Sequence, residues 1–442
     1  MSIENSDEGL KRVIGVTALT LSIISGVIGA GIFVLPAVVG IELGAFSVIA
    51  YIVCGILLAA IMVCYAEIGS RVITSGGSYA YVEKAFGTFP GYIINWLYFL
   101  GWGAISSAAL MNIVADSLNV LFPVFANTMV RAVFFLILVV FMIMVNIYGA
   151  KQGAGVVKVI AIIKLLPILG IIVFGFSKAN SANLQWEHLP SLKSFADTTL
   201  ILFFAFAGFE TALGASGEIK NPQRTVPLSI CIAAISVIIV YMLLQTVTQG
   251  VLGAQMAIVK DAPLAAVADR IIGPAGATIL LLCAALSCFG NVVLDLLCTP
   301  RSLFAGARDG IFPKYLGKVH SRFATPYLAI ITYGVLIFIF SISGGFRQLA
   351  IMASAIILIV YLAVILATIK LRLKNAGGGE KLFKAPGGWA TPLIGIGGIL
   401  WLLSSLGKWE IISTVIFIIV VGIVYFVTKW LRNKGGAVEI VK

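Results

Sequence analysis

Residues 21–36 read LSIISGVIGAGIFVLP, an apolar run in which Gly26, Gly29 and Gly31 fall within six residues. Each glycine inside a helix costs roughly 1 kcal/mol relative to alanine, so this spacing disfavours an unbroken helix. No strand precedes the run, so its GxG is not a nucleotide-binding loop. We therefore predict a helix over residues 13–39 that is interrupted around residues 27–31.

A second apolar run carries a similar interruption. Residues 204–214 read FAFAGFETALG, with a carboxylate at Glu210 two residues after Gly208. The two segments are five helices apart, which is typical of an inverted repeat with two broken helices that meet at mid-membrane. Backbone amides freed at a helix end can bind a carboxylate, and freed carbonyls can bind an ammonium. The alternative is that these glycines only allow close helix packing.

The composition is that of a membrane protein. Of the 442 residues, 60% are hydrophobic and 11% are charged, whereas soluble domains carry about 25% charged residues. The apolar runs are long and continuous, unlike the alternating strands of an outer-membrane barrel. These features exclude a soluble enzyme, a disordered chain and a disulfide-stabilised secreted module. The six cysteines lie in apolar runs without CxxC spacing, so we expect no disulfide framework, metal site or cofactor.

We predict an all-α integral membrane protein with twelve transmembrane helices, arranged as a five-plus-five inverted repeat plus two C-terminal helices. Residues 1–373 would form the repeat core, and residues 374–442 a cytoplasmic linker with helices 11 and 12. Residues 70–88 are too polar to span and are predicted to be a loop, while residues 251–270 resemble a short surface helix. The predicted spans are 13–39, 44–69, 89–121, 129–149, 155–177, 195–217, 226–250, 271–306, 325–343, 346–371, 390–407 and 410–431.

The distribution of Lys and Arg supports this count. On the side of the two termini, the loops and the adjoining ends of the spans hold 22 of these residues, those on the opposite side hold 7, and Lys164 lies deep inside a span. Cytoplasmic loops carry the excess of positive charge. We therefore predict that both termini are cytoplasmic in the inner membrane, and that the net charge of +12 reflects topology and not nucleic-acid binding.

Five motifs in order resemble the amino acid–polyamine–organocation (APC) superfamily, in particular bacterial amino acid antiporters and exchangers. They extend over most of the first ten helices, and the resemblance implies the predicted repeat fold and alternating access around a central site. The motifs are SGVIGAGIF (25–33), YAEIGSRVITSGGSYAYVEKAFG (65–87), FAFAGFETA (204–212), EIKNPQRTVP (218–227) and PRSLFAGARDGIFP (300–313).

The resemblance also implies which residues hold the substrate. The amides of Ala30 and Gly31 would bind the substrate carboxylate, with Gly29 allowing close approach. The carbonyls of Val27, Phe204 and Ala207 would accept the α-ammonium, and Ile28 and Ala205 complete the two interrupted segments. The Phe204 ring would cover the substrate, at a position where related antiporters often have a tryptophan with its N–H donor.

Two ionisable residues inside predicted spans are candidates for coupling and gating. A charged group at mid-bilayer costs at least ~2.5–3.5 kcal/mol, which makes Lys164 and Glu210 functional suspects. The resemblance implies that Lys164, in its KLxP context, occupies the place of a sodium ion in related sodium-coupled folds. Lys164 is also a candidate carrier of a coupled proton, or else a permanently charged structural tie. Glu210 is either a proton-responsive gate or a partner for unwound backbone.

Asp295 departs from the family pattern, which usually has an apolar or aromatic side chain there. Asn291 lies one turn earlier on the same helix face. A carboxylate at this place would favour a cationic side chain or a second amine on the substrate, or would pair with Lys164, and both interpretations stay open. Ser106, with Ser107 beside it, is a further candidate to line the pocket. Glu67, Arg71, Glu83 and Lys84 are expected to form a network at the cytoplasmic gate.

The sequence therefore predicts a secondary transporter of cationic or small polar amino acids that does not use sodium and works by proton coupling or exchange. The alternative is a polyamine or amine transporter of the same superfamily. The expected partners are the substrate, the lipid bilayer, protons and, as an option that the sequence leaves open, a second copy in a homodimer. A pump is excluded by the lack of a Walker motif, and no catalytic set is evident.

Overall fold

The computed structural model of the chain describes residues 14–29, 31–72, 77–148, 153–186, 189–213, 219–308, 314–323, 325–374 and 383–435. Within these ranges the chain is helical, and strand pairing is limited to one bridge between Ile14 and Ile219. The α-helices are α1 (Val16–Val27), α2 (Gly31–Leu43), α3 (Ser47–Arg71), α4 (Ser78–Phe86), α5 (Thr88–Trp96), α6 (Ile105–Leu121), α7 (Thr128–Tyr148), α8 (Gly153–Gly175), α9 (Leu192–Phe206), α10 (Glu210–Leu213), α11 (Pro222–Leu252), α12 (Pro263–Ile272), α13 (Pro274–Arg308), α14 (Tyr327–Ser343), α15 (Phe346–Lys374), α16 (Ala390–Leu403) and α17 (Lys408–Gly435).

Both interruptions occur where the glycines predict them. The first predicted span is divided into α1 and α2, and the sixth into α9 and α10. The third consists of α5, a π-helix at Leu97–Ala104 and α6. The other predicted spans begin and end within a few residues of one described helix each.

The loop prediction for residues 70–88 is wrong in part, because Ser78–Phe86 form α4. Gly77 has a positive φ of 55°, and the helix begins directly after it. Ala80, Tyr81 and Val82 are buried, so this short helix is stabilised by an apolar face that packs against α5 and α15. The short helix expected within residues 251–270 is present as α12.

Seven helices in the described part of the chain are long and apolar enough to cross a membrane. Three shorter apolar helices accompany them, namely α1, α14 and α16. On α7 and α17 large apolar side chains such as Ile137, Phe141 and Phe426 are exposed. Exposed apolar faces of this extent suit contact with lipid tails and not with water. The seven spans are Gly31–Arg71, Thr88–Leu121, Thr128–Tyr148, Pro222–Ala257, Pro274–Arg301, Phe346–Lys374 and Lys408–Val427.

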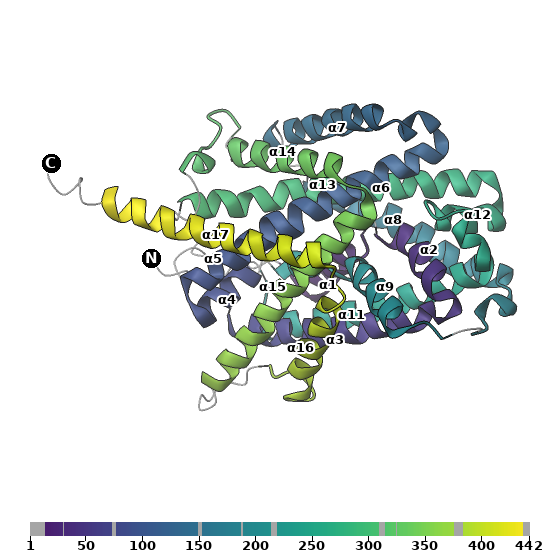
Figure 1. Cartoon of the computed structure of the whole chain (residues 1–442), viewed down its shortest axis with the longest axis horizontal. Helices are drawn as coiled ribbons and strands as arrows, with labels where there is room; N and C mark the ends of the chain where they lie inside the picture. The colour runs from purple at the N-terminus through teal and green to yellow at the C-terminus, as the bar shows by residue number, and fades with distance from the viewer. Residues whose placement is uncertain are drawn as a thin grey trace.

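The helices form two packed groups (Figure 1). In one group α6, α7, α13 and α14 pack together around an apolar cluster that includes Phe99, Phe135 and Tyr333. In the other, α3, α9, α11 and α15 pack with α1 and α2 around a larger cluster. Val27 and Phe204, one at each interruption, belong to the larger cluster. The interruptions are therefore enclosed by packed helices.

Candidate functional site

The first interruption separates α1 from α2 by a tight turn of the backbone. Ile28 leaves the helical region with a ψ of 73°, and the amide of Gly29 donates to the carbonyl of Val27 at 2.6 Å. The first four amides of a helix have no partner within that helix, so α2 presents free donors from Gly31 onward. Ala30, one of the predicted carboxylate-binding residues, lies outside the described residues. Gly29 and Gly31 lie on either side of it.

The second interruption is built on Gly208. This residue has a φ of 113°, a backbone conformation that residues other than glycine rarely adopt. A Cβ atom on Gly208 would lie 2.7 Å from the carbonyl oxygen of Gly26, and one on Gly26 would lie 2.9 Å from that of Gly208. The two interruptions thus touch backbone to backbone, and the contact requires glycine on both sides.

Lys164 connects the first interruption to two other helices. Its side chain is fully buried, and its Nζ donates to the carbonyl of Ser25 in α1 at 2.6 Å. A longer hydrogen bond of 3.5 Å joins Nζ to Oδ1 of Asn291 in α13. Asn291 also faces the interruption, since its Nδ2 lies 3.1 Å from the place of a Cβ on Gly29. Lys164 therefore lies beside the end of α1.

Glu210 opens α10, and its carboxylate bends back over the second interruption. Oε2 accepts the amide of Gly208 at 3.2 Å and the hydroxyl of Tyr361 in α15 at 2.5 Å. The indole of Trp102, from the π-helix, lies beside the same carboxylate. A π-helical turn often marks a functional site, and here it carries an aromatic donor toward the interruption.

Asp295 is held by three hydroxyl groups from three helices. Oδ2 accepts from Ser107 of α6 at 2.7 Å and from Tyr333 of α14, and Oδ1 accepts from Thr299 at 2.5 Å. Among the ion pairs of the described residues, none joins Asp295 to Lys164. Ser107 makes the contact to Asp295, while Ser106 donates to the carbonyl of Gly103 in the adjoining π-helix.

Phe204 lies where the two interruptions and the flanking helices meet. Its ring centroid is 5.8 Å from that of Trp102 and 5.7 Å from that of Phe346. A Cβ on Gly31 would lie 3.2 Å from the Phe204 ring and 3.4 Å from the Cα of Ala205. The geometry therefore brings Gly31, Phe204 and Ala205 together. Ala207, which follows the end of α9, is buried with them.

A tyrosine that the sequence did not single out joins the two interruptions. The hydroxyl of Tyr241 lies 3.0 Å from the carbonyl oxygen of Val27 and 2.8 Å from that of Ala205. Tyr333, Tyr361 and Trp102 are likewise contacts that no sequence motif indicated. Tyrosine and tryptophan are common in apolar runs that form a protein core. The local sequence does not show which carboxylate or carbonyl their side chains contact.

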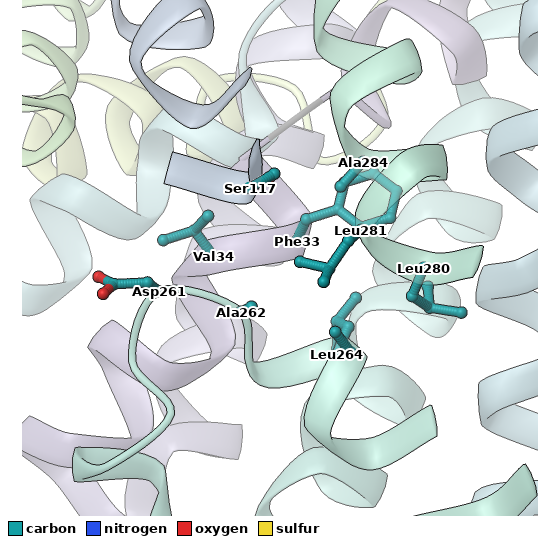
Figure 2. Close-up of a pocket in the computed structure, with 10 residues that line it drawn as sticks. Phe33, Val34, Ser117, Asp261, Ala262, Leu264, Leu280, Leu281 and Ala284 are labelled. Carbon is teal, nitrogen blue, oxygen red and sulfur yellow. The ribbon is translucent and has the colours of Figure 1, made fainter. Parts of the chain in front are cut away.

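A separate pocket lies beside α2 and shares no residue with the predicted site. Figure 2 shows Phe33 and Val34 of α2 facing it, with Leu264 of α12 and Leu281 of α13 across from them and Asp261 at one side. Its lining is mainly apolar. A zwitterionic ligand needs polar partners for both of its charges, so this pocket does not replace the interruptions as the candidate site.

These features define a helical membrane transporter with two interrupted helices. Residues 14–425 match the model of the amino acid permease family. The chain is 28% identical over 411 residues to the serine/threonine exchanger SteT of Bacillus subtilis, covering 91% of this chain and 93% of the relative. It is 28% identical over 445 residues to the branched-chain amino acid permease BcaP of the same organism, covering 97% and 96%. The human cystine/glutamate transporter is 28% identical over 354 residues, 77% of this chain and 70% of the relative.

The chain therefore belongs to the amino acid permease family, within the APC superfamily, as its motifs predict. It is a multi-pass membrane protein that transports amino acids, and it is not an enzyme.

Proposed function

We propose that this chain moves amino acids across the cytoplasmic membrane by alternating access, through twelve spans arranged as a five-plus-five inverted repeat with two added helices. In this arrangement the interrupted helices form the substrate site at mid-membrane. The excess of Lys and Arg in the loops on the side of the termini supports a cytoplasmic location for both termini. Residues 1–373 form the transport core, and the last two helices are attached to it.

The substrate's common head group fits between the interruptions. The amides at the start of α2 bind its carboxylate, and the carbonyls of Val27, Phe204 and Ala207 bind its ammonium. The support is the juxtaposition of unlike helix ends: α1 and α9 end beside the start of α2, and the last carbonyls of a helix lack a donor within that helix. The ring of Phe204 covers this place and excludes water.

Transport does not require sodium. The observation that carries this proposal is the buried Nζ of Lys164, which donates to the Ser25 carbonyl at 2.6 Å. A fixed ammonium at the end of α1 supplies the positive charge that a sodium ion would otherwise bring to these carbonyls. Glu210, held by Tyr361 and the amide of Gly208, acts as the gate over the second interruption.

Asp295 sets a preference for substrates with a cationic or small polar side chain. Its carboxylate is bound only by hydroxyl groups among the described residues. Hydroxyl groups can rotate, so they can release an acceptor position to a ligand's ammonium or guanidinium. The same observation supports the second candidate function, a transporter of amines or polyamines.

Uptake into proteoliposomes tests these proposals. The full-length protein is reconstituted and given a panel of labelled amino acids and amines, with and without internal substrate and across imposed pH gradients. We expect uptake that responds to internal substrate or to the proton gradient, and initial rates that survive replacement of external sodium by choline. A rate that rises saturably with sodium would refute the role given to Lys164.

A further inference from the structure

The carboxylate of Asp295 uses its two oxygens unequally. Oδ2 accepts from Ser107 at 2.7 Å and from Tyr333, and these two donors fill its two lone pairs. Oδ1 accepts from Thr299 at 2.5 Å and from no other donor among the hydrogen bonds of the described residues. Asp295 as a whole is half-buried. One acceptor position on Oδ1 therefore remains for a ligand.

Tyr333 reaches Asp295 from a helix that takes no part in the interruptions. It is fully buried on α14, which packs against α6, α7 and α13. Its ring lies beside that of Phe99, with centroids 5.0 Å apart, and both rings belong to the apolar cluster of this helix group. The hydroxyl groups of Ser107 and Thr299 lie close to its own. A ring packed on its faces moves little, so the place of the Tyr333 hydroxyl is well defined.

Gly103 provides the space in which the Tyr333 hydroxyl lies. It belongs to the π-helix Leu97–Ala104, and a Cβ atom on it would lie 2.6 Å from Oη of Tyr333. Packed atoms do not approach that closely, so an alanine there would displace the hydroxyl. The same Cβ would lie 3.5 Å from Cζ of Tyr333 and 3.5 Å from the carbonyl oxygen of Tyr98, and both distances are ordinary contacts. The hydroxyl, and not the ring, is therefore what requires a glycine at this position.

The two donors on Oδ2 come from different helices, α6 and α14, and together they restrain the carboxylate. Rotation about the terminal bond of an aspartate is soft, so a carboxylate that lacked one of these donors could turn more freely. While Oδ2 is held, the open acceptor position on Oδ1 keeps one direction. A ligand's ammonium then meets an acceptor that is already oriented, which lowers the cost of binding.

We propose that Tyr333 and Gly103 are positioning residues for the side chain of the substrate: Gly103 admits the Tyr333 hydroxyl, which orients the carboxylate of Asp295 toward a cationic group. Both act through Asp295 and do not themselves touch the substrate. The proposal rests on the function proposed for Asp295, and it names the residues that set the strength of the preference for cationic substrates.

The test is a double-mutant cycle of Tyr333→Phe and Gly103→Ala in the full-length protein in proteoliposomes. Inhibition constants are measured for lysine and for norleucine, which has the same head group but lacks the distal ammonium, against one labelled substrate of the parent. Tyr51→Phe and Gly170→Ala are the controls. The buried Tyr51 hydroxyl has no hydrogen-bond partner among the described residues, and a Cβ on Gly170 would meet no atom within 4 Å.

We expect each single variant to weaken lysine about tenfold and to leave norleucine near the parent value, while the controls change neither. Gly103→Ala should have little further effect in a Tyr333→Phe protein, because no hydroxyl is left to displace. Additive losses in the cycle would overturn the proposal, as would equal losses for both ligands or parent affinity for lysine.

Folding is checked by the norleucine constant and by monodispersity in detergent. If only one single variant folds, its constants for lysine and norleucine decide, and loss of folding in both would show a structural role and overturn the proposal. Asp295→Asn separates this failure from that of the proposed function. If the parent does not bind lysine, or if Asp295→Asn binds it as tightly as the parent, it is the function proposed for Asp295 that fails.

Discussion

At the scale of single residues, the contact between the two interruptions depends on Gly26 and Gly208, because a Cβ atom on either one would clash with the backbone of the other. Gly208 combines a φ of 113° with a carbonyl oxygen 2.7 Å from the place of its missing Cβ. The clashing atom, the carbonyl oxygen of Gly26, belongs to the backbone, so it cannot rotate away as a side chain could. The close approach of the two interruptions therefore depends on the absence of one carbon atom.

We expect Gly208→Ala to impair folding and abolish substrate binding, because it strains the backbone by about 1–3 kcal/mol and also forces α1 away from α10. Gly170→Ala is the matched control, since Gly170 lies within α8 and a Cβ there would meet no atom within 4 Å. Thermal stability in detergent and equilibrium binding of a transported amino acid measure both effects. Normal binding by Gly208→Ala would show that the interruptions are not the site.

We propose that Asp295 is the residue that separates cationic from neutral substrates. Asparagine keeps the shape of the side chain, and the hydroxyl groups of Ser107, Thr299 and Tyr333 can rotate to suit its amide. If the carboxylate binds a cationic side chain, Asp295→Asn removes a charged hydrogen bond of about 1.5–3 kcal/mol. Cationic ligands should then weaken roughly ten- to hundredfold, while neutral amino acids barely change.

Competition of both ligand types against one labelled substrate measures this difference, and the neutral ligands serve as the internal control. Equal weakening of all ligands would place Asp295 in the structural framework. Unchanged affinity for cationic ligands would remove it from the substrate site.

At the scale of elements, apolar runs and glycines were sufficient to predict nearly every helix. The runs are long enough to identify helices without ambiguity. A glycine cluster marks the end of α1, and the single Gly208 marks the end of α9. The helix α4 was missed because GGSYAY is polar in composition, and only its packing against α5 and α15 reveals an apolar face.

The contacts between elements were predicted less well than the elements themselves. Lys164 reaches α1 and α13, whereas its position in an apolar run indicates only that it is buried. Asp295, however, accepts from Tyr333 of α14, which lies 38 residues further along the chain. Glu210 accepts from Tyr361 of α15, which lies 151 residues further along. Sequence spacing carries no information about such distant pairs, since tertiary packing alone brings them together.

Lys164 connects three elements, and we expect Lys164→Met to fold but to lose transport of every substrate. None of the ion pairs of the described residues includes Lys164, and burying a charge without an opposite charge is costly, so an apolar side chain of similar volume removes that cost. The ammonium that links α8 to the end of α1 would nevertheless be lost. Melting temperature and initial uptake rates measure the two effects, with Lys178→Met, at an exposed turn after α8, as control. Uptake at the parent rate by Lys164→Met would contradict the role of this residue.

At the scale of the whole molecule, Glu67 joins the core to the helices that follow it. Its fully buried carboxylate accepts from Arg71 at 2.9 Å, from Arg372 of α15 and from the amide of Ala385 at 2.8 Å. Arg372 also donates to the carbonyl of Gly388 at 2.9 Å. The described part of the linker is thus bound to α3 and α15. Of the predicted network, the ion pairs of the described residues include Glu67 with Arg71, joined by Arg372, but neither Glu83 nor Lys84.

The last prediction follows from this connection. Removing one partner of a buried ion pair costs about 3–5 kcal/mol, because the other charges stay buried without compensation. Two guanidinium groups face Glu67, so we expect Glu67→Gln to lower the melting temperature clearly and to make residues 383–389 accessible to a protease. Glu42→Gln is the control, since Glu42 pairs with Arg347 at 3.6 Å in an exposed position, where such a pair contributes about 0–1 kcal/mol. If both variants melt with the parent and resist cleavage, the linker is held by its apolar contacts alone, and the last two helices are attached to the core without the help of this carboxylate.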